Sequence, residues 1–244
     1  MKTNMNFNLF TPTKLLFGCG KLNELGNQSM PGKKALLLIS NGQSVRTTGT
    51  LDRTVAQLDK ANAAHVLCAN IHENPSKEVV MEAAAVAREN GCDFIVALGG
   101  GAVLDSAVAA MATNPGDLWD YVHGGTGKGL PLQQPGLPIV TIATTSGTAS
   151  EINCWGVISN HATNEKIGFG YPELNPVLAI VDPELMRTVD VHRLSGFRCA
   201  VPQHGGNDQP LRQRAERADS PFCHRTHRQI PATRREGRQR FGSS

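Results

Sequence analysis

Short, continuous apolar runs alternate with amphipathic segments along the first 197 residues of the chain. Uninterrupted apolar character over a few residues is typical of strands that are buried on both faces of a parallel sheet. Such strands are predicted at residues 35–40, 65–69, 93–98, 137–143 and 178–181. A hairpin or an edge strand is predicted over residues 7–17, where two apolar segments flank a Thr-Pro-Thr turn.

Helical patterns fill the gaps between the first strands. Apolar side chains at spacings of four and three predict a helix over residues 51–63. Ser76 is placed to cap the N-terminus of a second helix, and Gly91 follows that helix as a C-cap glycine does. An Ala-rich helix is predicted at residues 102–112 and a short one at residues 21–27. This alternation predicts an α/β fold, a Rossmann-like parallel sheet with flanking helices on both faces.

Two later segments are rich in turn residues. Residues 154–159 and 166–170 predict a hairpin. The glycine-rich run at residues 124–129 suggests a phosphate loop, but no hydroxyl follows Lys128 and no strand precedes the run. We therefore predict a flexible surface turn at residues 124–129.

Three consecutive glycines, Gly99–Gly101, directly follow the predicted strand at residues 93–98. Glycines let a ligand approach the backbone closely, and the start of a helix offers free N–H groups to an anion. Ligands of open parallel sheets bind at the carboxyl ends of the strands. The run therefore predicts an anion site, with a tight packing turn as the alternative. Leu104 stands where the common dinucleotide fingerprint needs a glycine, so that motif is absent.

Charge divides the chain into two parts. Residues 198–244 contain ten Arg, no Lys and four Asp or Glu, whereas residues 1–197 carry a net charge of −3. The tail also has few Leu, Ile or Val and shows neither the helical nor the strand period. It cannot bury enough apolar surface to offset the entropy of ordering. We predict a folded domain over residues 1–197 and an irregular tail over residues 198–244.

Composition excludes several classes of protein. No apolar run reaches the roughly 18 residues of a membrane span, and the first ten residues lack the apolar core of a signal peptide. The six cysteines are too scattered for a disulfide scaffold or a zinc knuckle. We therefore expect a cytoplasmic protein with reduced thiols and no membrane partner.

Five motifs, in order and spacing, resemble those of the iron-containing (group III) alcohol dehydrogenases. The run from Ala97 to Asp105 is similar to the family's Gly-Gly-Gly-Ser-x-x-Asp loop, and the run from Thr144 to Glu151 is similar to its Thr-Thr-x-Gly-Thr-x-Ser-Glu segment. The other three motifs are Asn74-Pro75-Ser76, Lys166 and the run from Leu178 to Leu185. The resemblance covers about residues 7–197.

The resemblance implies a dehydroquinate synthase-like nucleotide-binding domain, followed in the family by an all-helical domain. It implies NAD or NADP as hydride carrier and Fe²⁺ or Zn²⁺ as Lewis acid on the oxygen of a small primary alcohol or aldehyde. It also implies a homodimer formed through the N-terminal strand. Glycerol dehydrogenases and dehydroquinate synthases share the glycine loop, and they remain an alternative to the alcohol dehydrogenase branch.

The resemblance also implies the cofactor-binding residues. They are Gly42, Ser44, Asn74, Gly99, Gly100, Gly101, Ala102, Asp105, Thr144, Thr145, Thr148 and Lys166. Ala102 replaces the family's serine, and losing that hydroxyl donor to a phosphate costs about 1.5–3 kcal/mol. No carboxylate follows the strand at residues 35–40, so we favour NADP over NAD, with Gly42, Ser44 and Arg46 near the 2′-phosphate. Arg46 as a solvated loop cation is the alternative.

The metal ligands of the family are missing from this sequence. The family has Asp-x-x-x-His on a helix, where this chain has Arg198 and Pro202 after Phe197. Arginine does not ligate a cation, and proline breaks a helix. We therefore assign no metal ligand and no catalytic residue here, and none to the tail histidines His204, His224 and His227.

A shifted reading frame accounts for the tail. Dropping one base after the codon of Phe197 permits Asp-Ala-Leu-Phe-His-Ser-Thr-Glu, which is the expected helix opening. We therefore predict a truncated enzyme that is weakly active or inactive. The alternative is a nucleotide-binding module whose basic tail binds nucleic acid. Aromatic residues for base stacking are sparse in the tail, so we do not favour nucleic acid as a partner.

Overall fold

The computed structural model describes residues 11–105 and 107–186 of the 244-residue chain. Contacts divide the chain into two units, residues 1–201 and residues 202–244. The predicted tail, residues 198–244, lies outside the described residues, and so do residues 7–10 of the predicted hairpin. No helix in the described part is long and apolar enough to cross a membrane.

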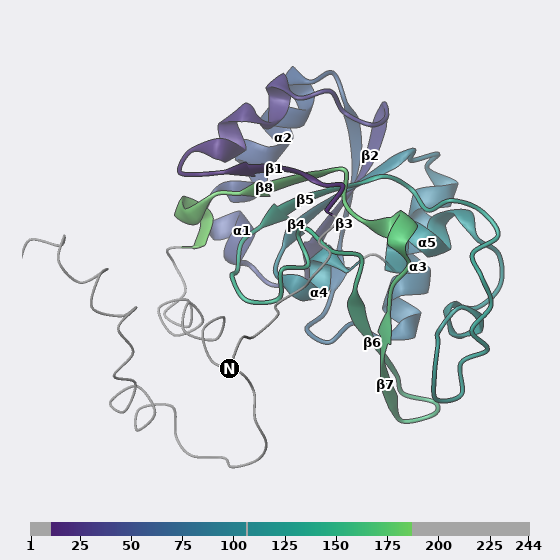
Figure 1. The fold of residues 1–244 in the computed structure, drawn as a ribbon. Helices are drawn as coiled ribbons and strands as arrows, with labels where there is room; N and C mark the ends of the chain where they lie inside the picture. The colour runs from purple at the N-terminus through teal and green to yellow at the C-terminus, as the bar shows by residue number, and fades with distance from the viewer. Residues whose placement is uncertain (1–10, 106, 187–244) are drawn as a thin grey trace, which may run out of the picture. The chain divides into compact units, whose positions relative to one another are not determined.

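Six parallel strands form one sheet in the order β1-β8-β5-β4-β2-β3 (Figure 1). The strands are β1 (Lys14–Phe17), β2 (Lys34–Ser40), β3 (Ala64–Ile71), β4 (Phe94–Gly99), β5 (Ile139–Ala143) and β8 (Leu178–Val181). The predicted parallel sheet is confirmed. Of the two possibilities for residues 7–17, the described part shows an edge strand, because β1 runs parallel to β8.

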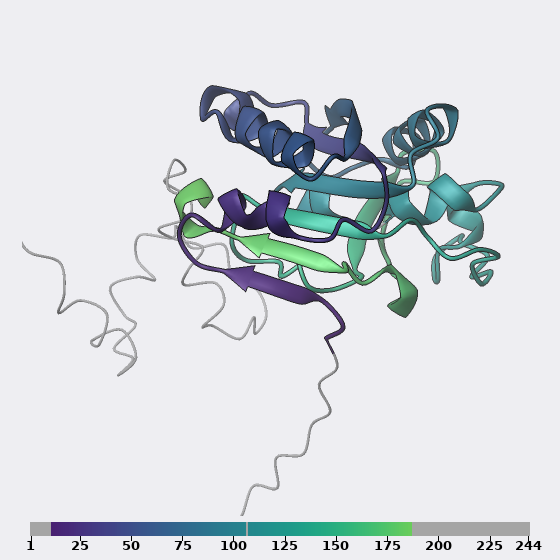
Figure 2. The same ribbon diagram turned by 90° about the horizontal axis from the view of Figure 1, so that it is seen from above.

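Helices cover both faces of the sheet (Figures 1 and 2). The α-helices are α1 (Ser44–Thr47), α2 (Thr50–Lys60), α3 (Lys77–Glu89), α4 (Gly101–Leu104) and α5 (Ala107–Thr113). The 3-10 helices are η1 (Lys21–Asn27), η2 (Leu118–Asp120), η3 (Pro172–Leu174) and η4 (Pro183–Met186). Leu37 and Ile39 of β2 pack with α2 and η1, whereas Leu36 and Leu38 pack with α3 and α5. The continuous apolar runs follow from this burial on two faces.

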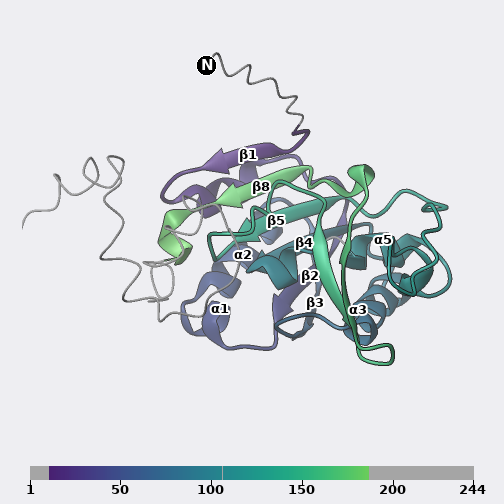
Figure 3. The ribbon, with the colours of Figure 1, turned by 60° about the horizontal axis from the view of Figure 1, so that its bottom comes forward.

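A two-stranded hairpin stands beside the sheet, next to α3 and α4 (Figure 3). Its antiparallel strands are β6 (Gly156–Asn160) and β7 (Glu165–Phe169), as predicted. The backbone N–H of Ser159 donates to the carbonyl oxygen of Pro75 at 2.9 Å. This bond ties the hairpin to the segment that leads into α3.

The predicted ends of α3 agree with the structure. The single Ala-rich helix predicted after the three glycines does not. The hydroxyl of Ser76 accepts a hydrogen bond from the N–H of Val79 at 3.4 Å, and Gly91 has a positive φ of 61°. The single helix predicted at residues 102–112 is wrong, because Asp105 is extended (ψ 132°) and separates α4 from α5. A run of alanines favours a helix but does not show where tertiary contacts interrupt it.

Candidate functional site

The two loops of the family resemblance meet at the carboxyl ends of adjacent strands. Gly99–Gly101 follow β4, and Thr144–Thr148 follow its neighbour β5. The N–H of Thr144 donates to the carbonyl oxygen of Gly99 at 2.9 Å. Parallel strands bring their carboxyl ends to one edge of a sheet, so loops that are distant in sequence become a single site.

The two loops approach each other closely at two glycines. A Cβ atom added to Gly100 would lie 3.0 Å from the hydroxyl oxygen of Thr145. One added to Gly101 would lie 3.0 Å from the side chain of Thr148. The two glycines therefore let the loops pack closely together. Gly101 has no side chain to cover its backbone, and it lines the pocket described next.

A pocket of about 400 Å³ opens next to these loops. It is lined by Asn74, Pro75, Gly101, Ala102, Asp105, Thr148, Ser150, Asn153, Trp155, Gly156, Val157 and Lys166. The structure thus brings six of the predicted site residues to one pocket. Gly99, Gly100, Thr144 and Thr145 lie in the adjoining loops without lining it.

The side chain of Asp105 reaches from the end of α4 to the hairpin. Its Oδ2 accepts a hydrogen bond from the N–H of Val157 at 3.2 Å. A Cβ atom added to Gly156 would come within 2.7 Å of the Cγ of Asp105, so a glycine there leaves room for the carboxyl group. Burial raises the pKa of Asp105 to about 7, although the hydrogen bond from Val157 acts in the opposite direction. Burial therefore favours the neutral form of this carboxyl group.

Lys166 of the hairpin and Asn74 close another side of the pocket. The Nζ of Lys166 donates to the Oδ1 of Asn74 at 2.5 Å, across 92 positions of sequence. Asn74 has a positive φ of 55°, a conformation that asparagine tolerates better than most residues. This bond leaves an ammonium group at the pocket wall, where it suits a phosphate or another anionic group.

Gly42, Ser44 and Arg46 lie at the end of β2 and do not line this pocket. Gly42 and Ser44 are exposed, and Ser44 begins α1. The guanidinium of Arg46 donates to the carbonyl oxygen of Gly42 at 3.1 Å. The structure therefore groups these three residues with one another at the carboxyl edge of the sheet.

Six lining residues were not among the predicted site residues: Pro75, Ser150, Asn153, Trp155, Gly156 and Val157. Pro75 and Ser150 belong to motifs of the family resemblance and were available from the sequence. The other four follow the Thr-Thr motif and enter the pocket because the hairpin turns back beside α4. That placement depends on tertiary packing, which local sequence does not specify.

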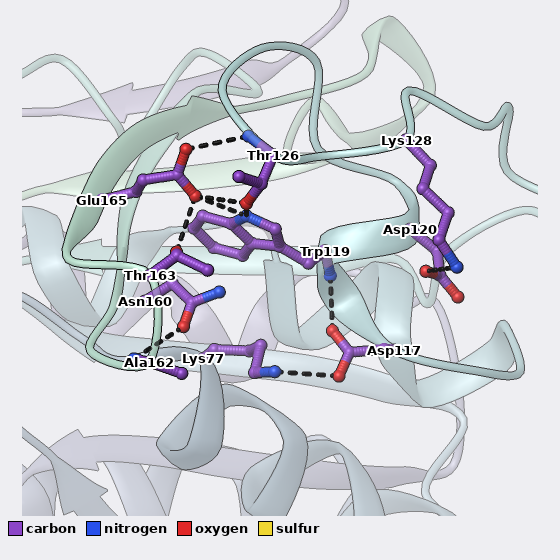
Figure 4. A network of polar contacts seen from close by, with 10 residues as sticks. All are labelled: Lys77, Asp117, Trp119, Asp120, Thr126, Lys128, Asn160, Ala162, Thr163 and Glu165. Atoms are coloured by element: carbon purple, nitrogen blue, oxygen red, sulfur yellow. Dashed lines mark hydrogen bonds and ion pairs between the residues drawn. The ribbon is translucent and has the colours of Figure 1, made fainter.

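The glycine-rich run at residues 124–129 is a surface turn, but it is held by a polar network (Figure 4). The carboxylate of Glu165 accepts hydrogen bonds from the N–H of Thr126 (2.8 Å), the hydroxyl of Thr163 (2.6 Å) and the indole of Trp119 (3.1 Å). The surface turn agrees with the prediction, and a residue 39 positions away anchors it, a contact that composition does not reveal.

Glu165 is expected to stabilise this turn in a pH-dependent way. Hydrogen bonds, first from Thr126 and then from Thr163, lower the pKa of Glu165 to about 2. A lowered pKa adds stability that is present above the unfolded-state value near 4.5 and is lost as the pH falls through 2. At pH 6, Glu165→Gln should therefore unfold at a lower urea concentration than the wild type. The difference between the two unfolding midpoints should shrink below pH 4.5. A difference that stays constant with pH would contradict this.

The described residues do not fit a metal ion. They contain no cluster of three or more His, Cys, Asp or Glu side chains that could hold one. Arg198, Pro202 and the tail histidines lie outside the described residues. We therefore derive no chemical step through a metal from this part of the chain.

Comparison with known proteins decides the family. Residues 12–183 match the profile of the family described as "Iron-containing alcohol dehydrogenase". The chain belongs to the iron-containing alcohol dehydrogenases. It is 39% identical over 180 residues to "Probable NADH-dependent butanol dehydrogenase 1" of Bacillus subtilis, covering 73% of this chain and 45% of the relative. It is 37% identical over 183 residues to "NADPH-dependent aldehyde reductase YqhD" of Escherichia coli, covering 73% and 45%.

Solved structures of this family share the fold. NADH-dependent butanol dehydrogenase A from Thermotoga maritima matches with a TM-score of 0.69 at 34% identity, over 75% of this chain and 46% of that chain. The archaeal Red Sea brine pool alcohol dehydrogenase ADH/D1 matches with a TM-score of 0.73 at 29% identity, over 81% and 51%. This iron-containing alcohol dehydrogenase chain thus spans about half the length of the relatives it matches.

Proposed function

We propose that this chain carries the dinucleotide-binding half of an NAD(P)-dependent alcohol dehydrogenase or aldehyde reductase. The observation that carries the proposal is the meeting of Gly99–Gly101 with Thr144–Thr148 beside a pocket at the carboxyl edge of the sheet. The names of its relatives, which include NADH- and NADPH-dependent enzymes, support a nicotinamide cofactor. Their substrates support a small primary alcohol or aldehyde as the partner in hydride transfer.

Each part of the site has a role in this proposal. The backbone of Gly99–Gly101 approaches the pyrophosphate, and the pocket beyond it receives the nicotinamide end next to Asp105. Thr144–Thr148 supply hydroxyl groups to the same ligand, and Lys166, held by Asn74, supplies a positive charge. Ala102 offers no hydroxyl, so binding is weaker than a serine there would give.

Calorimetric titration of the full-length chain with NADP⁺ and NAD⁺ tests this function. We expect saturable, weak binding of a dinucleotide, because the chain carries only part of the family's length. Absence of saturable binding for both dinucleotides would contradict the proposal.

We propose further that the cofactor is NADP. Among the residues at the end of β2, Gly42, Ser44 and Arg46 offer backbone, hydroxyl and guanidinium donors, and no carboxylate stands among residues 41–46. A carboxylate at this place holds the ribose hydroxyl of NAD, whereas an arginine accommodates the 2′-phosphate of NADP.

Arg46→Ala should separate the two cofactors. Loss of a charged hydrogen bond costs about 1.5–3 kcal/mol, so the affinity for NADP⁺ should fall by about 10- to 150-fold while that for NAD⁺ stays the same. Arg53→Ala, which removes a half-buried cation of α2 that bonds Asn23, is the matched control. Calorimetry on both variants gives the comparison. Equal losses for the two cofactors in Arg46→Ala would contradict the assignment.

The catalytic half of the enzyme is proposed to be out of frame after Phe197. The family profile ends at residue 183, and Arg198 and Pro202 stand where the resemblance places the first metal ligands. The chain supplied with Fe²⁺ or Zn²⁺ should therefore oxidise butanol far more slowly than an ordinary enzyme. Resequencing the DNA across codons 195–200 should reveal one base gained or lost, and an unchanged frame would contradict this proposal.

A homodimer through β1 is also proposed. β1 is an edge strand of the sheet, and its side chains Leu15 and Phe17 are 46% and 66% exposed. A second copy pairing along this edge would cover these apolar side chains. Sedimentation at tens of micromolar should show a dimer, and a monomer at that concentration would contradict it.

A further inference from the structure

Trp155 presents an aromatic ring to the pocket and has no part in the function proposed above. The residue is 60% exposed and lines the pocket. A Cβ atom added to Gly170 would lie 2.7 Å from the indole Cε3, so the backbone of Gly170 lies directly against the ring. The backbone N–H of Trp155 donates to the Oδ1 of Asn153 at 2.8 Å. The indole is therefore seated on one side and open on the other.

Asp105 lines the same pocket as Trp155. Its carboxyl group packs on Gly156, the residue after Trp155, and accepts a hydrogen bond from Val157. An indole face attracts a cation, and a carboxylate does so directly. Two such groups in the lining of one pocket favour a flat ring that carries positive charge.

We propose that Trp155 and Asp105 together bind the positively charged nicotinamide ring of the oxidised cofactor, with the ring stacked on the indole and its charge beside the carboxylate. This proposal rests on the proposed function and goes beyond it, because it assigns a preference between the two redox forms. The reduced ring is neutral and gains neither the cation–π attraction nor the ion pairing.

The other charge in the pocket agrees with this arrangement. Lys166 is the remaining titratable residue among those that line the pocket, and its Nζ is bonded to Asn74. An ammonium group suits the phosphates of the cofactor, whereas Asp105 and Trp155 suit the nicotinamide. The two charges thus orient the dinucleotide in one direction.

Protonation gives a second signature of the same pair. A nicotinamide cation beside Asp105 favours the carboxylate, so it lowers a pKa that burial has raised to about 7. Binding of the oxidised cofactor should therefore release a proton near neutral pH, and its affinity should rise as the pH increases through 7. Asp105→Asn should remove this pH dependence from the binding of the oxidised cofactor.

The experiment uses the charge-transfer absorption that an indole shows when it stacks on a pyridinium ring. The full-length chain is titrated with NADP⁺ and NADPH, and binding is measured independently by calorimetry. We expect the band with NADP⁺ only. Trp155→Leu should abolish the band and weaken NADP⁺ binding by about 2- to 30-fold, the range of a cation–π contact. Trp155→Phe should retain part of the affinity.

A matched control separates stacking from loss of an exposed aromatic residue. Phe17→Leu makes a similar change at a 66% exposed aromatic side chain of β1, outside the pocket, and should change neither the band nor the affinity. Binding without the band, or unchanged NADP⁺ affinity in Trp155→Leu, would overturn this inference and leave the proposed function intact. Failure of the wild type to bind either form would overturn both.

Discussion

Substitution of Gly101 by valine should abolish dinucleotide binding while the chain stays folded. Gly101 begins α4 and lines the pocket, and a Cβ atom there would already lie 3.0 Å from the side chain of Thr148. The two further methyl groups of valine must either push the Thr144–Thr148 loop away or fill the space of the ligand. Either outcome removes the space proposed for the pyrophosphate between the two loops.

Calorimetric titration with NADP⁺ measures this loss, and circular dichroism verifies the fold of the variant. The neighbouring substitution Ala102→Ser is the matched control, because it adds an atom in the same loop and also restores a hydroxyl donor. It should bind at least as well as the wild type. Gly101→Val that binds NADP⁺ with wild-type affinity would show that the ligand does not pass this glycine.

Among the substitutions proposed for this chain, Asp182→Ala should cause the largest loss in the free energy of unfolding. The Asp182 side chain is fully buried, and its carboxylate accepts hydrogen bonds from the backbone N–H groups of Gly20 (3.1 Å), Leu22 (3.2 Å) and Glu184 (3.0 Å). It thus holds the start of η1 and of η4 at the end of β8. Alanine leaves all three donors without this acceptor. The bond from Leu22 is buried and the other two are partly buried, so the cost is nearer to that of one unsatisfied buried donor, about 1–3 kcal/mol, than to three times that value.

The expected loss in the free energy of unfolding is about 3 kcal/mol, or roughly 6–12 °C in melting temperature for a domain of this size. Urea and thermal denaturation measure both values. Asp182→Asn is the control, since the amide keeps one oxygen acceptor and should lose less. An Asp182→Ala variant as stable as the wild type would show that water replaces the carboxylate at little cost.

The sheet was predictable because burial on two faces leaves a direct mark on the sequence. β2, β4 and β8 each read as an uninterrupted apolar run, since helices cover both sides of these strands. The glycines after β4 were equally visible. Their neighbours Thr144–Thr148 were found through the family resemblance, and the parallel order of β4 and β5 then places the two loops together.

The features that sequence reasoning missed depend on contacts between distant residues. The extended Asp105 interrupts a run of good helix formers and bonds a residue 52 positions later. Glu165 anchors a glycine-rich turn that composition alone marks as flexible. Trp155 enters the pocket only because the β6–β7 hairpin folds against α4 and Gly170 makes room for the indole. Local sequence propensity does not specify contacts between residues so far apart in the chain.

Backbone amide NMR of the full-length chain during titration with NADP⁺ tests the dinucleotide site most directly. The account predicts saturable shifts that are largest at Gly99–Gly101 and at Thr144–Thr148, followed by the hairpin residues around Val157. Saturable shifts confined to other parts of the sheet, or no shifts at millimolar cofactor, would contradict it.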